Sequence, residues 1–199
     1  MLKDLARSQG HDLDVRTNQE PGASFGQHLG FPLTLDAISE GGYDVAILQD
    51  RSSHHADFVT KEAASVLSDT KGLVALIQAQ SPSCRMILEN TWPYEKDACM
   101  GYGTLDAFGK ALADGCGKVA SACGCDVSPI AKAFEAAAGD GIQMYYPDNH
   151  HQSQYGSYLK ACVNYLMIYG EAFNEDASDC GLSPAVTSRL RKIAESIVL

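Results

Sequence analysis

The sequence predicts an α/β domain with three layers (α/β/α), in which helices cover both faces of a parallel β-sheet. Residues 43–49 and residues 85–90 are nearly continuous apolar runs, which are typical of strands buried on both sides of such a sheet. Segments with helical periodicity separate and follow these runs, so strands alternate with helices along the chain. The 199 residues contain no internal repeat and no low-complexity tract, which favours a single domain over residues 1–199.

The other elements follow from local patterns of apolar, glycine and proline residues. Residues 12–18 alternate apolar with polar side chains, which predicts a strand exposed on one face. Residues 59–79 have helical periodicity and form either one helix or two helices broken near Gly72. The remaining predicted elements are helix 1–8, a glycine-rich turn at 21–28, helix 33–40, helix 103–123, strand 126–128, helix 130–138, a helix from residue 154 onward and a packing helix at 184–199.

Composition limits the partners and compartments that suit the chain. The formal net charge of −10, from 25 acidic and 15 basic residues, argues against a nucleic-acid groove or an anionic membrane surface as a partner. No apolar run has the length of a membrane span, and the N-terminal residues do not resemble a signal peptide. We therefore expect a cytoplasmic protein for the chain as written, and export if a signal peptide precedes it in the gene. Small neutral or cationic molecules and uncharged glycans remain open as substrates.

The cysteines indicate neither a disulfide framework nor a metal site. Their number is odd and their spacing does not match that of zinc ligands, so reduced, structural thiols are expected and no cofactor is predicted. The cysteines are Cys84, Cys99, Cys116, Cys123, Cys125, Cys162 and Cys180.

The densest group of acid–base side chains lies in residues 146–159, directly before an apolar helix. Pro147 disfavours helix at the residue before it, which places Asp148 and His151 at a loop-to-helix junction. Their three-residue spacing lets the Asp148 carboxylate reach the His151 imidazole and fix its protonated nitrogen, so that the other nitrogen serves as a general base. A simpler interpretation is that Asp148 caps the helix and that the histidines lie on a solvated loop.

Other polar segments follow the predicted strands at their carboxyl ends, where open α/β sheets bind ligands. Residues 49–55 supply amide, carboxylate, guanidinium, hydroxyl and imidazole groups directly after the strand at 43–49. Trp92 follows the strand at 85–90, and is either a wall of a substrate site or an aromatic residue at the edge of the core. The glycine-rich turn at 21–28 is a further loop of this kind.

Taken in order, these motifs resemble those of the SGNH/GDSL hydrolase superfamily, and specifically a bacterial branch of it. The resemblance spans nearly the whole chain, and its last motif is the most specific. It implies a flavodoxin-like fold and an esterase, lipase or carbohydrate deacetylase activity. The matching segments are Pro21-Gly22-Ala23-Ser24-Phe25 with His28, Asp44-Val45-Ala46-Ile47-Leu48-Gln49, Val127-Ser128-Pro129-Ile130, and Asp148-Asn149-His150-His151-Gln152-Ser153 running into Gly156-Ser157-Tyr158-Leu159.

The resemblance implies a role for each candidate site residue. Asp148 and His151 are the acid and the base of a serine-hydrolase triad, whereas His150 is a bystander. The backbone N–H of a matching glycine and the side-chain amide of a glutamine near the family's asparagine position are the expected oxyanion donors. The candidate oxyanion and substrate-binding residues are Gly22, Gln49, Ser52 and Trp92.

One departure from the family pattern concerns the nucleophile. The family's serine lies in a Gly-Asn/Asp-Ser segment after a first strand, ahead of a helix like residues 1–8, and this sequence has no matching segment. The intact gene product is therefore expected to be a serine ester hydrolase, and the chain as written to be weakly active or inactive. The position of Ser24 close to Gly22 leaves it open as a substitute nucleophile. Without the first strand, an exposed sheet edge is expected, which a second copy of the chain would cover.

Two other functions stay open. A metal-dependent hydrolase would use His54, His55, His150, His151 and Asp148, since imidazole and carboxylate groups suit zinc, although their spacing matches no recognised metal motif. A non-catalytic module would bind a carbohydrate or another acylated ligand in the same kind of cleft and perform no chemistry.

Overall fold

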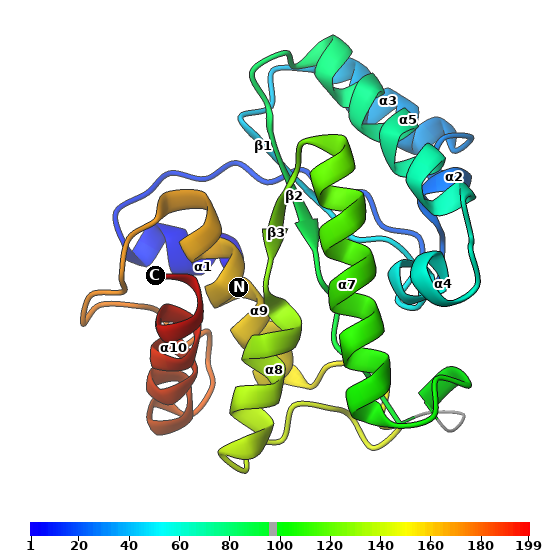
Figure 1. The fold of residues 1–199 in the computed structure, drawn as a ribbon. Helices are drawn as coiled ribbons and strands as arrows, with labels where there is room; N and C mark the ends of the chain where they lie inside the picture. Colours follow the sequence, from blue (N-terminus) through cyan, green and yellow to red (C-terminus); the bar gives the residue numbers. More distant parts are fainter. Residues whose placement is uncertain (96–98) are drawn as a thin grey trace. The chain divides into compact units, whose positions relative to one another are not determined.

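A computed structural model describes residues 1–95 and 99–199 of the chain (Figure 1). These residues group into two compact units. The sheet unit comprises Arg16–Pro93 and Met100–Val127, and the helical unit comprises Met1–Val15, Tyr94–Cys99 and Ser128–Leu199. A single domain over the whole chain stays a prediction.

The β-sheet is parallel and has the strand order β1-β2-β3. Strand β1 (Val45–Leu48) pairs with β2 (Arg85–Glu89) in a register that runs from Val45 opposite Arg85 to Leu48 opposite Leu88. Strand β3 (Asp126–Ser128) is hydrogen-bonded to β2. Helices alternate with these strands along the chain (Figure 1), so the predicted α/β fold class with a parallel sheet is confirmed.

The helices of the sheet unit pack around an apolar core. They are α2 (Phe25–His28), α3 (Pro32–Glu40), α4 (His54–Thr60), α5 (Ser65–Gln80) and α7 (Leu105–Cys123). Helix α5 contacts α2, α3, α4 and α7, and α7 also contacts α4 and β2. The core contains Phe25, Leu48, Val66, Leu73, Val74, Ile77, Cys84, Met86, Leu88, Cys116, Val119 and Ala120.

The helical unit is organised around α9 (Gln154–Tyr169), which contacts α1 (Leu2–Ser8), α8 (Ile130–Gly139) and α10 (Pro184–Val198) (Figure 1). Residues 161–166 of α9 are all buried, and since these six residues span more than one turn, this part of the helix is covered on every side, as suits its central position. The buried residues on this helix are Gly156, Tyr158, Leu159, Ala161, Cys162, Val163, Asn164, Tyr165 and Leu166.

Three of the local predictions are wrong, and one of them is the turn at 21–28, whose second half forms helix α2. Residues 11–20 form no regular structure, although part of this segment alternates apolar with polar side chains. Alternation cannot make a strand where no neighbouring strand supplies backbone hydrogen bonds. The helical pattern at 59–79 breaks between α4 and α5, where Glu62 has a φ of 52°, and not at Gly72. Gly72 lies inside α5, where a Cβ atom would come within 3.2 Å of the Leu29 side chain.

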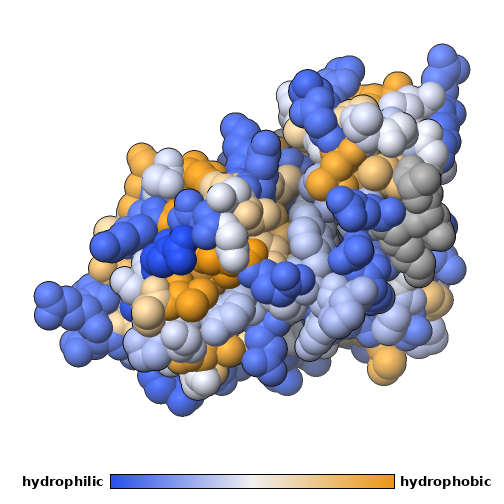
Figure 2. Space-filling model, turned by 90° about the horizontal axis from the view of Figure 1, so that it is seen from below, coloured by the Kyte–Doolittle hydropathy of each residue, from blue (hydrophilic) through white to orange (hydrophobic). Residues whose placement is uncertain are grey.

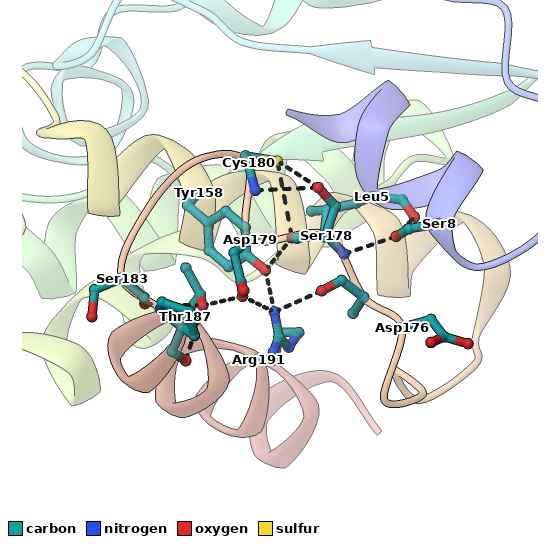
Figure 3. Close-up of polar contacts among 12 residues, drawn as sticks. Leu5, Ser8, Tyr158, Asp176, Ser178, Asp179, Cys180, Ser183, Thr187 and Arg191 are labelled. Atoms are coloured by element: carbon teal, nitrogen blue, oxygen red, sulfur yellow. Dashed lines mark hydrogen bonds and ion pairs between the residues drawn. The ribbon is translucent and has the colours of Figure 1, made fainter.

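A polar cluster ties the connector between α9 and α10 to both helices (Figure 3). From its Nη1 atom, Arg191 donates to the Tyr158 hydroxyl at 2.7 Å, to the Asp179 carboxylate at 3.0 Å and to the Ala177 carbonyl at 3.3 Å. The Tyr158 hydroxyl donates to the carbonyl oxygen of Ser178 at 2.8 Å. Because the Arg191 side chain is only 14% exposed, water replaces these contacts poorly when they are lost.

Arg191→Met is expected to lower the free energy of unfolding by about 2 kcal/mol, since it removes hydrogen bonds to a charged group and leaves Asp179 without its cation. The matched control is Arg189→Met on the same helix, whose 51% exposed side chain pairs with Asp140 at 3.2 Å. The control should cost less than about 1 kcal/mol, as exposed ion pairs do. Urea unfolding of the two variants measures both effects, and equal losses would contradict the prediction.

Exposed apolar side chains are scattered over the surface. The most exposed of the large ones are Leu33, at 77%, and Leu199, at 63%. On the face drawn in Figure 2, hydrophobic side chains form small patches that hydrophilic ones separate. Within residues 1–95 and 99–199, no helix is both long and apolar enough to cross a membrane.

Candidate functional site

The loop before α9 is held in a tight backbone conformation. Tyr145 and Gln152 form an antiparallel bridge, and the backbone N–H of Tyr146 donates to the carbonyl oxygen of His151 at 2.9 Å. Asn149 turns the chain with a φ of 51°, in the left-handed region that asparagine tolerates better than most residues. The loop therefore returns on itself and brings its two ends together.

The Asp148 carboxylate is the centre of this loop. Its Oδ1 atom accepts the backbone N–H groups of His150 and His151, each at 3.0 Å, and its Oδ2 atom lies 2.7 Å from Nδ1 of His151. The hydrogen bond with the His151 ring, followed by those with the two backbone groups, holds the pKa of the Asp148 carboxyl well below its usual range. Asp148 is therefore ionised at neutral pH.

This contact decides which nitrogen of His151 is open. A carboxylate only accepts hydrogen bonds, so Nδ1 of His151 carries the proton that is shared with Asp148. The Nε2 atom of the neutral imidazole then has a lone pair that can accept a proton. The His151 side chain is 67% exposed, which leaves the ring accessible from solvent.

Ser153, and not Asp148, caps helix α9. The Ser153 hydroxyl oxygen accepts the backbone N–H of Gly156 at 3.1 Å, and the hydroxyl donates to the carbonyl oxygen of Gln143 at 2.7 Å. The interpretation of Asp148 as a helix cap is therefore wrong. Its carboxylate is used inside the loop, by the two histidines that follow it.

In the sheet unit, Ser24 caps the short helix α2. The hydroxyl oxygen of Ser24 accepts the backbone N–H of Gln27 at 3.3 Å. The backbone N–H of Ser24 donates to the side-chain oxygen of Gln27 at 3.0 Å, which completes a capping box. The preceding Gly22 has a φ of 73°, which favours glycine. The Ser24 hydroxyl thus has a structural task, which makes it a poor substitute for a nucleophilic serine.

A buried carboxylate follows strand β1 directly. Asp50 Oδ1 accepts the backbone N–H groups of Phe25 at 3.0 Å and of Arg51 at 2.8 Å, while Oδ2 lies 3.3 Å from Nδ1 of His54. Asp50 thereby links the end of β1 to the starts of α2 and α4. Asp50 is the carboxylate that the polar segment 49–55 places at the tip of the buried strand, whereas its partner Phe25 could be found only in the structure.

The other candidate residues of the sheet unit lie after β1 and β2. Gln49 is exposed and follows β1, and the carbonyl oxygen of Ser52 accepts the Thr91 hydroxyl at 3.3 Å. Trp92 is 7% exposed, which fits an aromatic residue at the edge of the core better than a substrate wall. The roles of Gly22, Gln49, Ser52 and Trp92 stay predictions.

The histidines give the metal hypothesis no support. His55 is 2% exposed, and burial lowers the pKa of its imidazole. Among the residues that the structure describes, no group of three or more histidine, cysteine, aspartate or glutamate side chains is arranged to hold a metal ion.

Two solved structures resemble this fold. A DUF4886 family protein from Bacteroides uniformis superposes with a TM-score of 0.78 at 16% identity, over 100% of this chain and 88% of that chain. A proposed SGNH hydrolase from Slackia heliotrinireducens gives a TM-score of 0.68 at 22% identity, over 84% of this chain and 90% of that chain. The chain has an SGNH-like fold. At these identities the likeness shows the SGNH-like fold alone, without an activity or a substrate.

No family model and no curated protein sequence matches this chain. The SGNH-like fold confirms the resemblance that the sequence motifs indicated. Within that fold, the contact between Asp148 and His151 is the acid–base arrangement that the geometry establishes. Their catalytic roles stay predictions.

Proposed function

We propose that this protein is an SGNH-type ester hydrolase, either an esterase or a carbohydrate O-deacetylase, in which Asp148 and His151 are the acid–base pair. The observation that carries the proposal is the 2.7 Å contact between Asp148 Oδ2 and His151 Nδ1 in a chain with an SGNH-like fold. This contact supplies an ionised carboxylate, a fixed tautomer and an accessible second nitrogen, the three features that a general base of this class requires.

The proposed reaction proceeds in two acyl-transfer steps. The Nε2 atom of His151 takes the proton of a serine hydroxyl as its oxygen attacks the ester carbonyl, and then gives that proton to the leaving alcohol. Water then attacks the acyl-enzyme carbonyl and loses a proton to the same nitrogen, which passes that proton to the serine oxygen as the acyl–serine bond breaks and the acid is released. Asp148 stabilises the imidazolium that forms in each step, at an ion-pair distance that is already set.

The other candidate residues take supporting roles in the proposal. The family resemblance gives the oxyanion to the backbone N–H of Gly22 and the side-chain amide of Gln49, and substrate binding to Ser52, and the proposal keeps these roles. The nucleophile is a serine of the Gly-Asn/Asp-Ser type, for which the 199 residues contain no matching segment.

The net charge of −10 favours substrates without negative charge. Short acyl esters of neutral sugars satisfy this condition and also fit the deacetylase form of the proposal. A second candidate function is a non-catalytic module that binds such acylated glycans, which the lack of a Gly-Asn/Asp-Ser segment favours. The two functions differ in whether acetate is released.

The test compares two proteins: the 199-residue chain and the same chain extended by any residues that are encoded in frame ahead of Met1. Each is incubated with 4-nitrophenyl acetate and with acetylated xylo-oligosaccharides, and released acetate and calorimetric binding are both measured. We expect turnover by the extended protein, and weak or no turnover by the shorter chain. Binding of the acetylated sugars without acetate release by either protein would overturn the hydrolase proposal in favour of the binding module.

A further inference from the structure

The side chain of His150 contacts two other aromatic rings of the helical unit. The ring centroids of Tyr94 and His150 are 4.1 Å apart, and those of His150 and His151 are 4.4 Å apart. We call Tyr94, His150 and His151 the ring row. The resemblance to the SGNH hydrolases gives the middle ring no role, yet it is the ring that joins the proposed base to the interior of the unit.

The exposed position of His151 makes such a contact useful. Its side chain is 67% exposed, and Asp148 holds it through one ring nitrogen. The imidazole turns about its Cα–Cβ and Cβ–Cγ bonds, and one hydrogen bond at Nδ1 restrains these rotations less than a hydrogen bond and a ring contact do together. A general base needs its accepting nitrogen to point steadily in one direction, because small errors in orientation reduce the rate strongly.

His150 is itself held from two sides. Its backbone N–H donates to Oδ1 of Asp148 at 3.0 Å, so the carboxylate that binds His151 also fixes the backbone of its neighbour. Its ring contacts Tyr94, which is 3% exposed and therefore anchored in the interior of the unit. The ring row thus runs from a buried tyrosine to an exposed histidine.

We propose that His150 is a positioning residue, which holds the His151 imidazole in its catalytic orientation through the ring row. The inference rests on the proposed role of His151 as general base. It adds to that role the group that restrains the rotation of the His151 ring. The alternative is that the ring contacts hold only the loop backbone, in which case the ring of His151 would not respond to the loss of its neighbour.

Two substitutions separate these possibilities. His150→Ala removes the middle ring, and His150→Phe keeps an aromatic ring of similar shape without its nitrogens. If ring contact positions His151, the phenylalanine variant restores what the alanine variant loses. Tyr94→Leu removes the other end of the ring row while leaving His150 in place, so it reports on the same contact should His150→Ala fail to fold.

The main readout is the tautomer of His151 in the 199-residue chain, from long-range ¹H–¹⁵N spectra. In His150→Ala, the less restrained ring of His151 should spend less time against Asp148, so the ratio of the Nδ1–H to the Nε2–H form should fall roughly fivefold. His150→Phe should keep the wild-type ratio. His54, whose Nδ1 lies 3.3 Å from Asp50 in the sheet unit, is the internal control and should not change.

A second readout is kinetic and uses the protein form that turns over. His150→Ala should lower kcat about tenfold and leave KM within about twofold, because positioning of a base acts on the chemical step. An unchanged tautomer ratio in both His150→Ala and Tyr94→Leu would overturn the inference, as would a His150→Phe variant as impaired as His150→Ala. The spectra need no turnover, so failure of the hydrolase proposal and failure of this inference are distinguishable.

Discussion

Replacing His151 by alanine is expected to lower kcat/KM for ester hydrolysis by about 10³-fold, the loss typical of removing a general base. The reason is local: His151 is the residue whose Nδ1 the Asp148 carboxylate holds at 2.7 Å, so its other nitrogen is the prepared proton acceptor. The measurement is acetate release from 4-nitrophenyl acetate by whichever of the two proteins compared above, the 199-residue chain or its extended form, turns over the ester. His28→Ala, which removes a histidine of the sheet unit that contacts Thr34, serves as the control and should retain the wild-type rate.

Asp148→Asn sharpens this expectation, because asparagine keeps an oxygen for the two backbone N–H groups but places a donor or a neutral acceptor against His151. The value of kcat/KM for ester hydrolysis should fall about 10²-fold. This loss is smaller than for a buried carboxylate, because Asp148 is 47% exposed and water partly replaces its contact with His151. The depressed pKa of Asp148 keeps it ionised in weak acid, so its protonation does not limit activity there.

Wild-type rates in the His151→Ala variant would show that another group is the base.

Gly115→Ala is expected to destabilise the sheet unit by at least about 3 kcal/mol, the upper end of overpacking costs. Helices α4 and α7 pack closely at this position, and a Cβ atom on Gly115 would overlap the carbonyl group of His55. Backbone atoms cannot move aside as a flexible side chain can, so the two helices must separate. That separation would disturb a core that includes Cys116 and Val119 on the same helix.

The chain supplies a matched control two residues further along α7. A Cβ atom on Gly117 would meet no atom within 4 Å, and Gly117 lies in the helix interior. Gly117→Ala should therefore stabilise the protein by about 0.5–1 kcal/mol through helix propensity. Urea unfolding followed by circular dichroism measures both variants. The packing argument is wrong if Gly115→Ala unfolds at the same urea concentration as Gly117→Ala.

Most elements could be read from the sequence because their signals are local. The apolar runs that became β1 and β2, and the three- and four-residue spacing on α9, each depend on neighbours within one element. The failures at residues 12–18 and at Gly72 have the opposite cause. A strand requires a partner that its own residues do not specify, and a glycine inside a helix can serve packing, as Gly72 does against Leu29.

The candidate site divides in the same way. The pairing of Asp148 with His151 spans three residues of one loop, so spacing and chemistry were enough to predict the contact. The link from Asp50 to the backbone of Phe25 spans 25 residues and depends on how β1 and α2 are placed. The assignment of the α9 cap to Ser153 required the hydrogen bonds themselves, because Asp148 was an equally good cap by residue type.

By itself, the sequence determined the alternation of strands and helices and the pairing of Asp148 with His151 in one loop, since both are set by residues close together in the chain. Only the tertiary structure decided the close contact of Gly115 with α4 and the contact of Tyr94 with His150. Both join residues more than fifty positions apart, and such contacts form only when the packing of whole elements brings them together.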